Sequence, residues 1–242
     1  MKTSWFGPIL LLCGFCSSVN ATPLLVNGGF ETGSLSGWTI ASQAGSFPGS
    51  NFFALTGTAL PQSSGTTVGA ATGLFYAVSD GSGSEAHALI QPFTVSSPAS
   101  SVLLSFSMFV NSYGGNVINP IGLDFTDGTN QHARVDILAA GASAFDTGAG
   151  VLRNFYLGTD AGTNPHAYTN YTFDITSLVG GGGTFQLRFA EVDNQLFLNM
   201  GVDNVSIDAT GGRVPEPSSI VLSILGLVLL ARSRLRRQTF FS

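Results

Sequence analysis

Short apolar runs alternate with polar stretches along most of the 242-residue chain. The runs are rich in Val, Ile, Leu and Phe, and the stretches between them are rich in Gly, Ser, Thr, Asn and Asp, which is typical of strands joined by turns and loops. No segment between residues 22 and 212 keeps a helical periodicity beyond a turn or two. The pattern predicts strands at residues 74–80, 88–95, 101–110, 117–125, 133–138, 171–175, 184–192 and 201–208.

The run 184–192 shows strand-like alternation most clearly. Phe185, Leu187 and Phe189 occupy every second position, and Gln186, Arg188 and Ala190 lie between them. Because successive side chains of a strand point to opposite faces, we expect one face of this segment in the core and the other facing water.

The connections between the runs narrow the fold class. The pair Asp127-Gly128 predicts a tight hairpin turn between the runs that flank it. Eight or more strands in a single domain, joined in part by long loops rich in Gly and Ser, predict an all-β, jelly-roll β-sandwich. The long loops are expected around residues 41–50, 56–67, 139–150 and 158–170.

The first 21 residues have the layout of a secretory signal peptide. Lys2 precedes an apolar run too short for an ordinary membrane span, and small and polar residues follow it up to a cleavage site after Ala21. A lipoprotein signal is the alternative, since Cys13 and Cys16 lie here, but the residues before both cysteines are large. Cleavage after Ala21 removes both cysteines, so the mature chain is expected to form no disulfide.

Residues 22–212 have the size of one domain and are strongly acidic. They contain thirteen Asp and Glu residues, three arginines and no lysine, which gives a formal charge of −10. The remaining arginines lie in residues 213–242, so the whole-chain charge of −5 hides this asymmetry. An acidic surface repels phosphate backbones and attracts cations, so we expect no nucleic acid among the partners of this protein.

Residues 213–242 form a tail of different composition. The motif Pro215-Glu216-Pro217 is followed by fourteen uncharged residues, 218–231, and then by four arginines. As a helix this run spans about 21 Å at ~1.5 Å per residue, against about 30 Å of hydrocarbon, so it predicts a short transmembrane helix with its arginines in the cytoplasm. A buried C-terminal core helix is the alternative, which the arginines and the preceding prolines disfavour.

The tail resembles the PEP-CTERM sorting signal of Gram-negative bacteria. The resemblance covers residues 214–237, and the five residues after the arginines depart from it. It implies that exosortase, a membrane protease-transpeptidase, recognises Pro215, Glu216 and Pro217. It further implies a transient inner-membrane anchor, export to the cell surface or extracellular matrix, and association with exopolysaccharide and biofilm.

The two edges of the domain resemble galactose-binding-like jelly rolls, the fold of many carbohydrate-binding modules. One edge carries Asn-Gly-Gly-Phe-Glu at 27–31 with Gly-Trp shortly after it, and the other carries residues 201–208. In that family the first and last strands lie near each other and often share a structural calcium ion. The resemblance implies Asn27, Glu31 and Asp203 as ligands, because calcium prefers carboxylate and carbonyl oxygens. The alternative is that both acids are ordinary loop and strand-end carboxylates.

Exposed aromatic side chains are the usual platforms for sugars. Trp38 matches a position that the resembling domains bury, so it is a poor candidate for such a platform. The loop aromatics Tyr113, Tyr156, Tyr168 and Tyr171 are better placed, with loop packing as their alternative role. The sequence alone identifies no residue that contacts a ligand.

The sequence carries no recognisable catalytic motif. His87, His132 and His166 are scattered without the spacing of a metal site, and there is no nucleophile elbow. Acid pairs for glycoside hydrolysis need no sequence proximity, so a secreted polysaccharide hydrolase is kept as the second alternative. The expected function is that of a non-catalytic surface or extracellular-matrix protein, and the first alternative is a carbohydrate-binding, lectin-like module.

Overall fold

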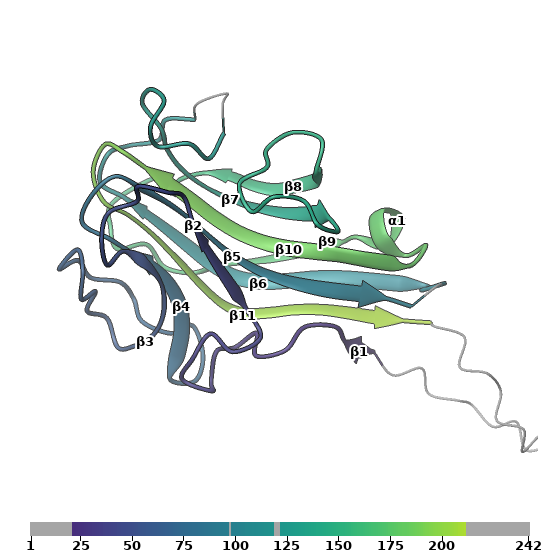
Figure 1. Ribbon diagram of the computed structural model, residues 1–242. Helices are drawn as coiled ribbons and strands as arrows, with labels where there is room; N and C mark the ends of the chain where they lie inside the picture. Colours follow the sequence, from purple (N-terminus) through teal and green to yellow (C-terminus); the bar gives the residue numbers. More distant parts are fainter. Residues whose placement is uncertain (1–20, 97, 119–121, 212–242) are drawn as a thin grey trace, which may run out of the picture.

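The computed structural model describes residues 21–96, 98–118 and 122–211. It confirms the predicted all-β, jelly-roll sandwich, with two antiparallel sheets packed face to face (Figure 1). All its strands lie between residues 22 and 210. Two predicted segments lie outside the described residues. One is the signal peptide, except for Ala21, and the other is the tail with Pro215, Glu216 and Pro217. Within the described ranges, no helix has the length and apolarity needed to cross a membrane.

The first sheet has six strands in the order β3-β4-β11-β6-β9, and β1 also pairs with β11. Thr22 of β1 lies opposite Ala209 of β11, so the two ends of the domain lie side by side, as the family resemblance implies. The strands are β1 (Thr22–Pro23), β3 (Asn51–Thr56), β4 (Phe75–Asp80), β6 (Ser101–Ser112), β9 (Thr169–Asp174) and β11 (Leu198–Thr210).

The second sheet has five strands in the order β2-β5-β10-β7-β8. One short helix, α1 (Thr176–Val179), precedes β10 at the end of the sandwich (Figure 1). The strands are β2 (Thr39–Ser42), β5 (Glu85–Val95), β7 (Gln131–Ala139), β8 (Val151–Gly158) and β10 (Gly183–Asp193).

The main core lies between the sheets and follows the predicted alternation. Leu187 and Phe189 of β10 face the first sheet, where the Phe189 ring meets Phe106 edge to face at 5.3 Å between centroids. Trp38 is 8% exposed and packs on Phe189 at 6.0 Å, so its predicted burial is confirmed. Full burial of each such side chain contributes roughly 1.5–3 kcal/mol, and the described residues contain no cysteine that could add a disulfide.

The outer face of the second sheet is also covered, and a buried ionic network lies there. Asp136 of β7 accepts hydrogen bonds from Arg134 and Arg188, with N–O distances of 2.5 to 3.1 Å. Arg188 is fully buried and also donates to the carbonyl oxygens of Ala144 and Asp146. The predicted wet face of 184–192 is therefore wrong at Arg188 and Ala190. The Arg188 guanidinium holds the loop after β7 against the sheet, and Ala190 lies in an apolar cluster covered by Leu123.

Seven of the eight predicted strands are confirmed, and the run 117–125 is wrong in its described part. Val117 forms one isolated bridge with Gln131, and no other described residue of the run pairs in a strand. The side chain of Asn130 donates to the backbone carbonyls of Gly122 and Asp124, which would bond to a neighbouring strand if this run were a strand. The hairpin predicted at Asp127-Gly128 is therefore absent from the described residues around it.

Candidate functional site

A groove lies on the outer face of the first sheet, where three strands bring uncharged polar side chains together. Ser107 of β6 stands directly opposite Asn170 of β9, so their side chains share one face. On the other side of β6, a bulge in β11 between Asp203 and Ser206 displaces the chain, and Asn204 has a positive φ of 51°. A bulge re-aims side chains, and here Asn204 turns towards Ser107.

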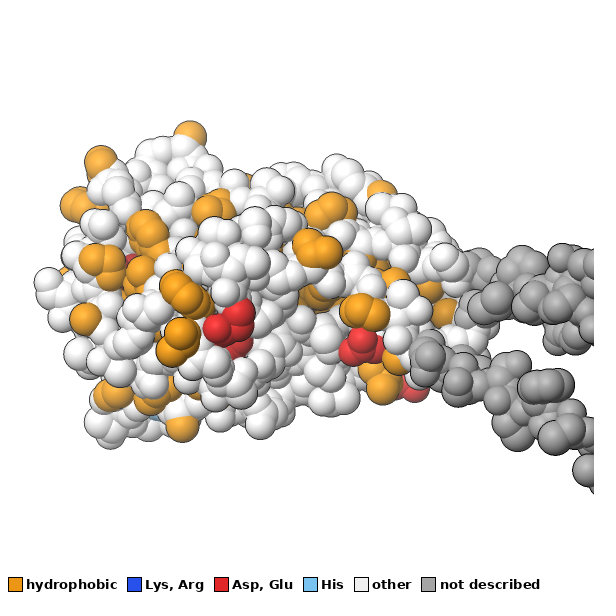
Figure 2. Space-filling view, turned by 90° about the horizontal axis from the view of Figure 1, so that it is seen from below, with side chains coloured by type: hydrophobic (Ala, Val, Ile, Leu, Met, Phe, Trp, Pro, Cys, Tyr) orange, Lys and Arg blue, Asp and Glu red, His pale blue; other side chains and the backbone are white. Residues whose placement is uncertain are grey.

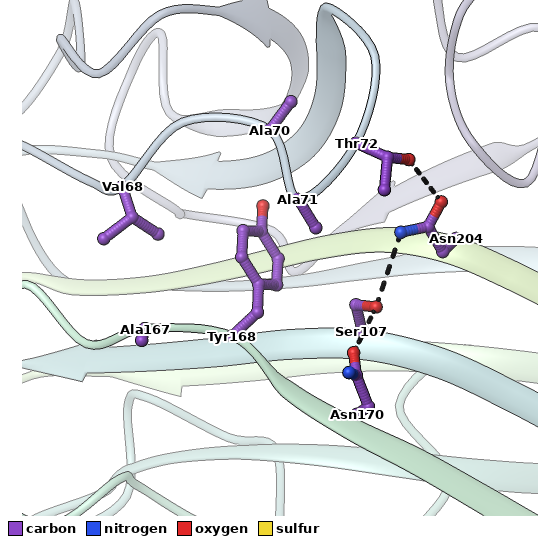
Figure 3. A pocket seen from close by; sticks show the side chains of 9 residues that line it. All are labelled: Val68, Ala70, Ala71, Thr72, Ser107, Ala167, Tyr168, Asn170 and Asn204. Carbon is purple, nitrogen blue, oxygen red and sulfur yellow. Dashed lines mark hydrogen bonds between the residues drawn. The ribbon is translucent and has the colours of Figure 1, made fainter.

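A chain of hydrogen bonds runs across the strands through this groove (Figure 3). The Thr72 hydroxyl donates to Asn204 Oδ1 at 2.7 Å, Asn204 Nδ2 donates to Ser107 Oγ at 3.5 Å, and Ser107 Oγ donates to Asn170 Oδ1 at 2.8 Å. Asn170 is exposed, and its amide nitrogen stands at the donating end of the chain. The chain therefore offers a row of oriented donors and acceptors to a ligand.

Tyr168 forms the aromatic wall of the groove. Its ring packs edge to face on Phe109 at 4.9 Å, and its hydroxyl donates to the carbonyl of Gly69 at 2.9 Å. Burial raises the pKa of Tyr168, and the charge of Asp203 raises it further, so the hydroxyl stays protonated at neutral pH. The ring is half-buried and held from two sides, which leaves a rigid apolar surface beside the polar row (Figure 3).

The groove has a volume of about 410 Å³ and contains no charged side chain among its lining residues. This volume lies in the range of small-ligand pockets, roughly 300–1,000 Å³. Amides, hydroxyls and one aromatic face suit a neutral ligand rich in hydroxyl groups. The lining residues are Val68, Ala70, Ala71, Thr72, Ser107, Ala167, Tyr168, Asn170 and Asn204.

Two of the predicted site residues, Glu31 and Asp203, hold the loop that forms one wall of this groove. Asp203 Oδ2 accepts the N–H groups of Ala71 and Thr72 at 2.9 and 3.0 Å. Glu31 Oε1 accepts those of Leu74 and Phe75, both at 3.0 Å. Burial raises the pKa of Asp203, and the nearby charge of Glu31 also raises it, against the effect of the backbone N–H donors. The structure thus brings these two acids together at one loop.

The third predicted calcium ligand, Asn27, is held by hydrogen bonds to other residues. Its side-chain nitrogen donates to the backbone carbonyls of Ser34 and Ser36, and its backbone carbonyl accepts the indole N–H of Trp38. Glu31 and Asp203 each keep acceptor capacity beyond the N–H bonds they receive, so two of the three residues fit an oxygen-ligated ion. Calcium binding at this place stays a prediction.

Of the four tyrosines considered as sugar platforms, only Tyr168 lines the groove. Tyr171 stacks on Phe106 at 4.9 Å, and Tyr156 donates its hydroxyl to Asp160 while packing against Tyr171. Tyr113 is 41% exposed and lies against Phe197, away from the groove. The three therefore complete loops or the core.

A cluster of ionisable side chains that no sequence motif predicts lies inside the sandwich. It is formed by Glu85, His87 and Glu191, with Asp193 next to them. His87 and Glu85 are two positions apart on β5, a spacing that places both on one face of a strand. The predicted strand began at residue 88, so the sequence pattern did not place Glu85 and His87 on the same strand. The sequence shows no histidine spacing typical of a metal site, and the structure nevertheless brings His87 close to Glu85 and Glu191.

Figure 2 shows the face of the molecule that points downward in Figure 1. This face carries no single large apolar patch. Hydrophobic side chains form small separate groups there, and acidic side chains gather at two places. Scattered exposed apolar side chains are normal for a protein surface. This face therefore gives no sign of a broad hydrophobic interface.

Comparison with solved structures finds distant similarities over most of the domain. A family 61 carbohydrate-binding module in complex with β-1,4-galactotriose aligns with 77% of this chain and 97% of its own, at 14% identity and a TM-score of 0.46. An apo cyclase from Fischerella aligns with 78% of this chain and 96% of its own, at 18% identity and 0.47. A xylan-binding domain of module family 22 covers 81% and 98%, at 11% identity and 0.39. No family model and no curated protein matches the chain. At such low identity, no ligand of these proteins transfers to this one.

Proposed function

We propose that the domain is a non-catalytic carbohydrate-binding module whose binding site is the groove between the 68–72 loop and strands β6, β9 and β11. The observation that supports this most directly is the row of hydrogen-bonded, uncharged side chains from Thr72 to Asn170 beside the Tyr168 ring. Sugars offer hydroxyls to such a row and C–H faces to an aromatic ring. This favours the carbohydrate-binding alternative over an unspecific matrix component.

The polar row also continues beyond the groove along the same sheet face. Ser105 Oγ and Thr172 Oγ1 lie 3.2 Å apart and form the next cross-strand pair of β6 and β9 on the same face as Ser107 and Asn170. A groove that opens onto a second polar pair suits a polymer better than a single sugar. Exopolysaccharide is therefore the proposed ligand class.

The test is a glycan array followed by affinity electrophoresis of the purified chain in gels that contain the best polysaccharide. Thr72→Val and Asn170→Ala should each weaken binding about tenfold, the loss expected for one or two hydrogen bonds. Thr94→Val, on the other sheet and outside the groove, is the matched control and should bind as wild type. A folded protein that binds no glycan, or variants that bind equally, would contradict the proposal.

The ends of the sequence support export and sorting as part of the same function. A module held at the surface of a Gram-negative cell by PEP-CTERM processing meets exopolysaccharide as it is secreted. Replacing Pro215, Glu216 and Pro217 by alanine in a host with an exosortase should leave the unprocessed chain in the inner-membrane fraction. Equal processing of wild type and variant, seen by immunoblot, would count against exosortase recognition.

A structural calcium ion at Glu31 and Asp203 completes the proposal. Calcium should raise the melting temperature of the wild-type chain, since a ligand that binds only the folded state stabilises it. Glu31→Gln should reduce that increase. If calcium leaves both proteins unchanged, the two acids act only as acceptors for the loop N–H groups.

A further inference from the structure

Four ionisable side chains meet inside the sandwich, at the end of β5 and β10. Glu85 pairs with Asp193 and His87 pairs with Glu191 across the two antiparallel strands. All four occupy the alternate positions that, further along the same strands, put Leu89 and Phe189 in the main core. The cluster therefore lies between the two sheets, on the opposite face of the second sheet from the Asp136 network.

The carboxylates of this cluster are buried without the partners that such groups need. Glu85, His87 and Glu191 are fully buried, and Asp193 is 3% exposed. Among the described residues, no hydrogen bond of good geometry reaches the four carboxylate oxygens of Glu85 and Glu191, and the only donor that acts on either group is the His87 backbone N–H near Glu191. Asp193 accepts one bond, from the Leu198 N–H at 3.0 Å. Buried carboxylates without donors are costly unless a cation or protons compensate them.

No guanidinium supplies that compensation. The three arginines within the described ranges are placed elsewhere: Arg134 and Arg188 bind Asp136, and Arg153 lies over the Phe155 ring at 5.1 Å. The carboxylates of the cluster therefore have no arginine among the described residues to balance their negative charge.

His87 adds a nitrogen ligand with a fixed orientation. Its Nδ1 lies 2.9 Å from Ser42 Oγ, and its Nε2 lies 3.0 Å from Ser50 Oγ and 3.9 Å from Glu85 Oε2. A metal-binding histidine usually makes a hydrogen bond with its other nitrogen, which sets the tautomer, and Ser42 is placed for that role. One ligand atom each from Glu85, His87 and Glu191 all lie within 4.8 Å of one another.

We propose that Glu85, His87 and Glu191 bind one divalent first-row transition-metal ion, with zinc as the best fit, and that Asp193 supplies a further carboxylate beside it. A set of one imidazole and several carboxylates suits zinc or manganese, whereas calcium takes oxygen ligands only. Small side-chain movements bring atoms 4.8 Å apart onto one ion, because metal–ligand distances are about 2.0–2.2 Å. The site is separate from Glu31 and Asp203, and it joins the ends of β5 and β10.

Two further features suit an ion at this place. A pocket of about 310 Å³ lies beside the cluster and has Asp193 in its wall; the other lining residues are Ser82, Gly83, Ser84 and residues 194–197. Gly81 leaves the space that the Glu85 carboxylate fills, since a Cβ atom there would lie 1.9 Å from Glu85 Oε2. The carboxylate is thus packed in place rather than free to turn away.

The test uses the full chain after treatment with EDTA and dialysis, titrated separately with zinc, manganese and calcium by calorimetry. Zinc should bind at one ion per chain through this cluster and raise the melting temperature by about 5 to 10 °C at a hundred times its Kd. Glu191→Gln, which keeps the shape and removes the charge, should weaken zinc binding at least thirtyfold. Asp208→Asn, on β11 and outside both proposed metal sites, is the matched control and should keep wild-type zinc binding.

Cobalt provides a second readout that a purely structural effect would not move. Bound Co²⁺ should give visible absorption bands in the wild-type chain, and His87→Gln should shift or remove them. If Glu191→Gln fails to fold by circular dichroism, Glu85→Gln serves the same purpose. Wild-type protein that binds none of the three metals, or that gains stability only from protonation at lower pH, would overturn the proposal, as would unchanged zinc binding in folded Glu191→Gln.

Discussion

Asp203 and Asn204 are consecutive residues of β11, and both contact the loop that walls the groove. Asp203 Oδ2 accepts the N–H groups of Ala71 and Thr72, and Asn204 Oδ1 accepts the Thr72 hydroxyl at 2.7 Å. The bulge and the positive φ of Asn204 let neighbouring side chains reach the same loop, which regular alternation forbids. One carboxylate fixes the loop backbone while the adjacent amide lines the groove.

Replacing Asp203 by alanine should therefore cost both stability and binding. The loop N–H groups lose a shared charged acceptor, which we expect to cost about 1–3 kcal/mol of unfolding free energy and to weaken glycan binding. Urea denaturation and affinity electrophoresis measure the two effects. Asp208→Ala, on the same strand and with no carboxylate hydrogen bond to any described residue, is the control and should change neither. Unchanged stability of Asp203→Ala would show that the loop does not depend on this acceptor.

Tyr168→Phe separates the ring from its hydroxyl. The variant keeps the packing against Phe109 but loses the hydrogen bond to the Gly69 carbonyl. Stability should fall by about 0.5–1.5 kcal/mol, the usual net value of one hydrogen bond. Glycan affinity should fall less than it does in Tyr168→Ala, which also removes the aromatic wall. Equal losses in the two variants, measured by calorimetric titration, would assign recognition to the hydroxyl alone.

Asp136 should be the most sensitive ionic position of the domain. Burial raises the pKa of Asp136, but hydrogen bonds and charges from Arg134 and Arg188 outweigh burial and hold it below its ordinary value. Asp136→Asn leaves two buried guanidinium groups without their carboxylate and should cost about 3–5 kcal/mol in urea denaturation. Because the folded-state pKa is depressed, this stability is present above the ordinary pKa of about 3.9 and disappears as pH falls below it. Asp208→Asn should lose almost nothing; a similarly small loss in Asp136→Asn would contradict the network's importance.

The alternation of apolar residues was sufficient for the fold class and for most of the long central strands. Phe185, Leu187 and Phe189 pack as their spacing predicts, because a two-residue period leaves few other ways to bury them. The strand prediction for 117–125 was wrong because Leu123 and Phe125 lie in a loop that covers the outer face of the second sheet. Apolar residues in such a cover have the same composition as a strand, and only their long-range packing separates the two.

The candidate sites were predictable only in part. Family resemblance placed Glu31 and Asp203 near each other, and the structure shows them at one loop. The groove depends on the cross-strand register of Ser107 and Asn170 and on the bulge at Asn204, which no local pattern encodes. The buried cluster likewise depends on pairing between β5 and β10, because the paired residues His87 and Glu191 are 104 positions apart in the sequence.

His132 should make the domain less stable in mild acid. It lies in β7 near Arg134. Burial and, to a smaller extent, the positive charge of Arg134 lower its pKa from 6.5 to about 4. A hydrogen bond with the Val117 backbone and the negative charge of Asp136 act in the opposite direction. The unfolded chain therefore takes up a proton before the folded chain does, so stability falls as pH decreases from about 6.5 to 4, by about 3 kcal/mol for a shift of this size. His132→Leu should remove this pH dependence of the unfolding free energy. The difference in unfolding free energy between wild type and variant should therefore change with pH across this window and be constant above it. Urea denaturation at intervals from pH 8 to pH 4 measures the difference, and a constant offset throughout would show that His132 is not held neutral by burial.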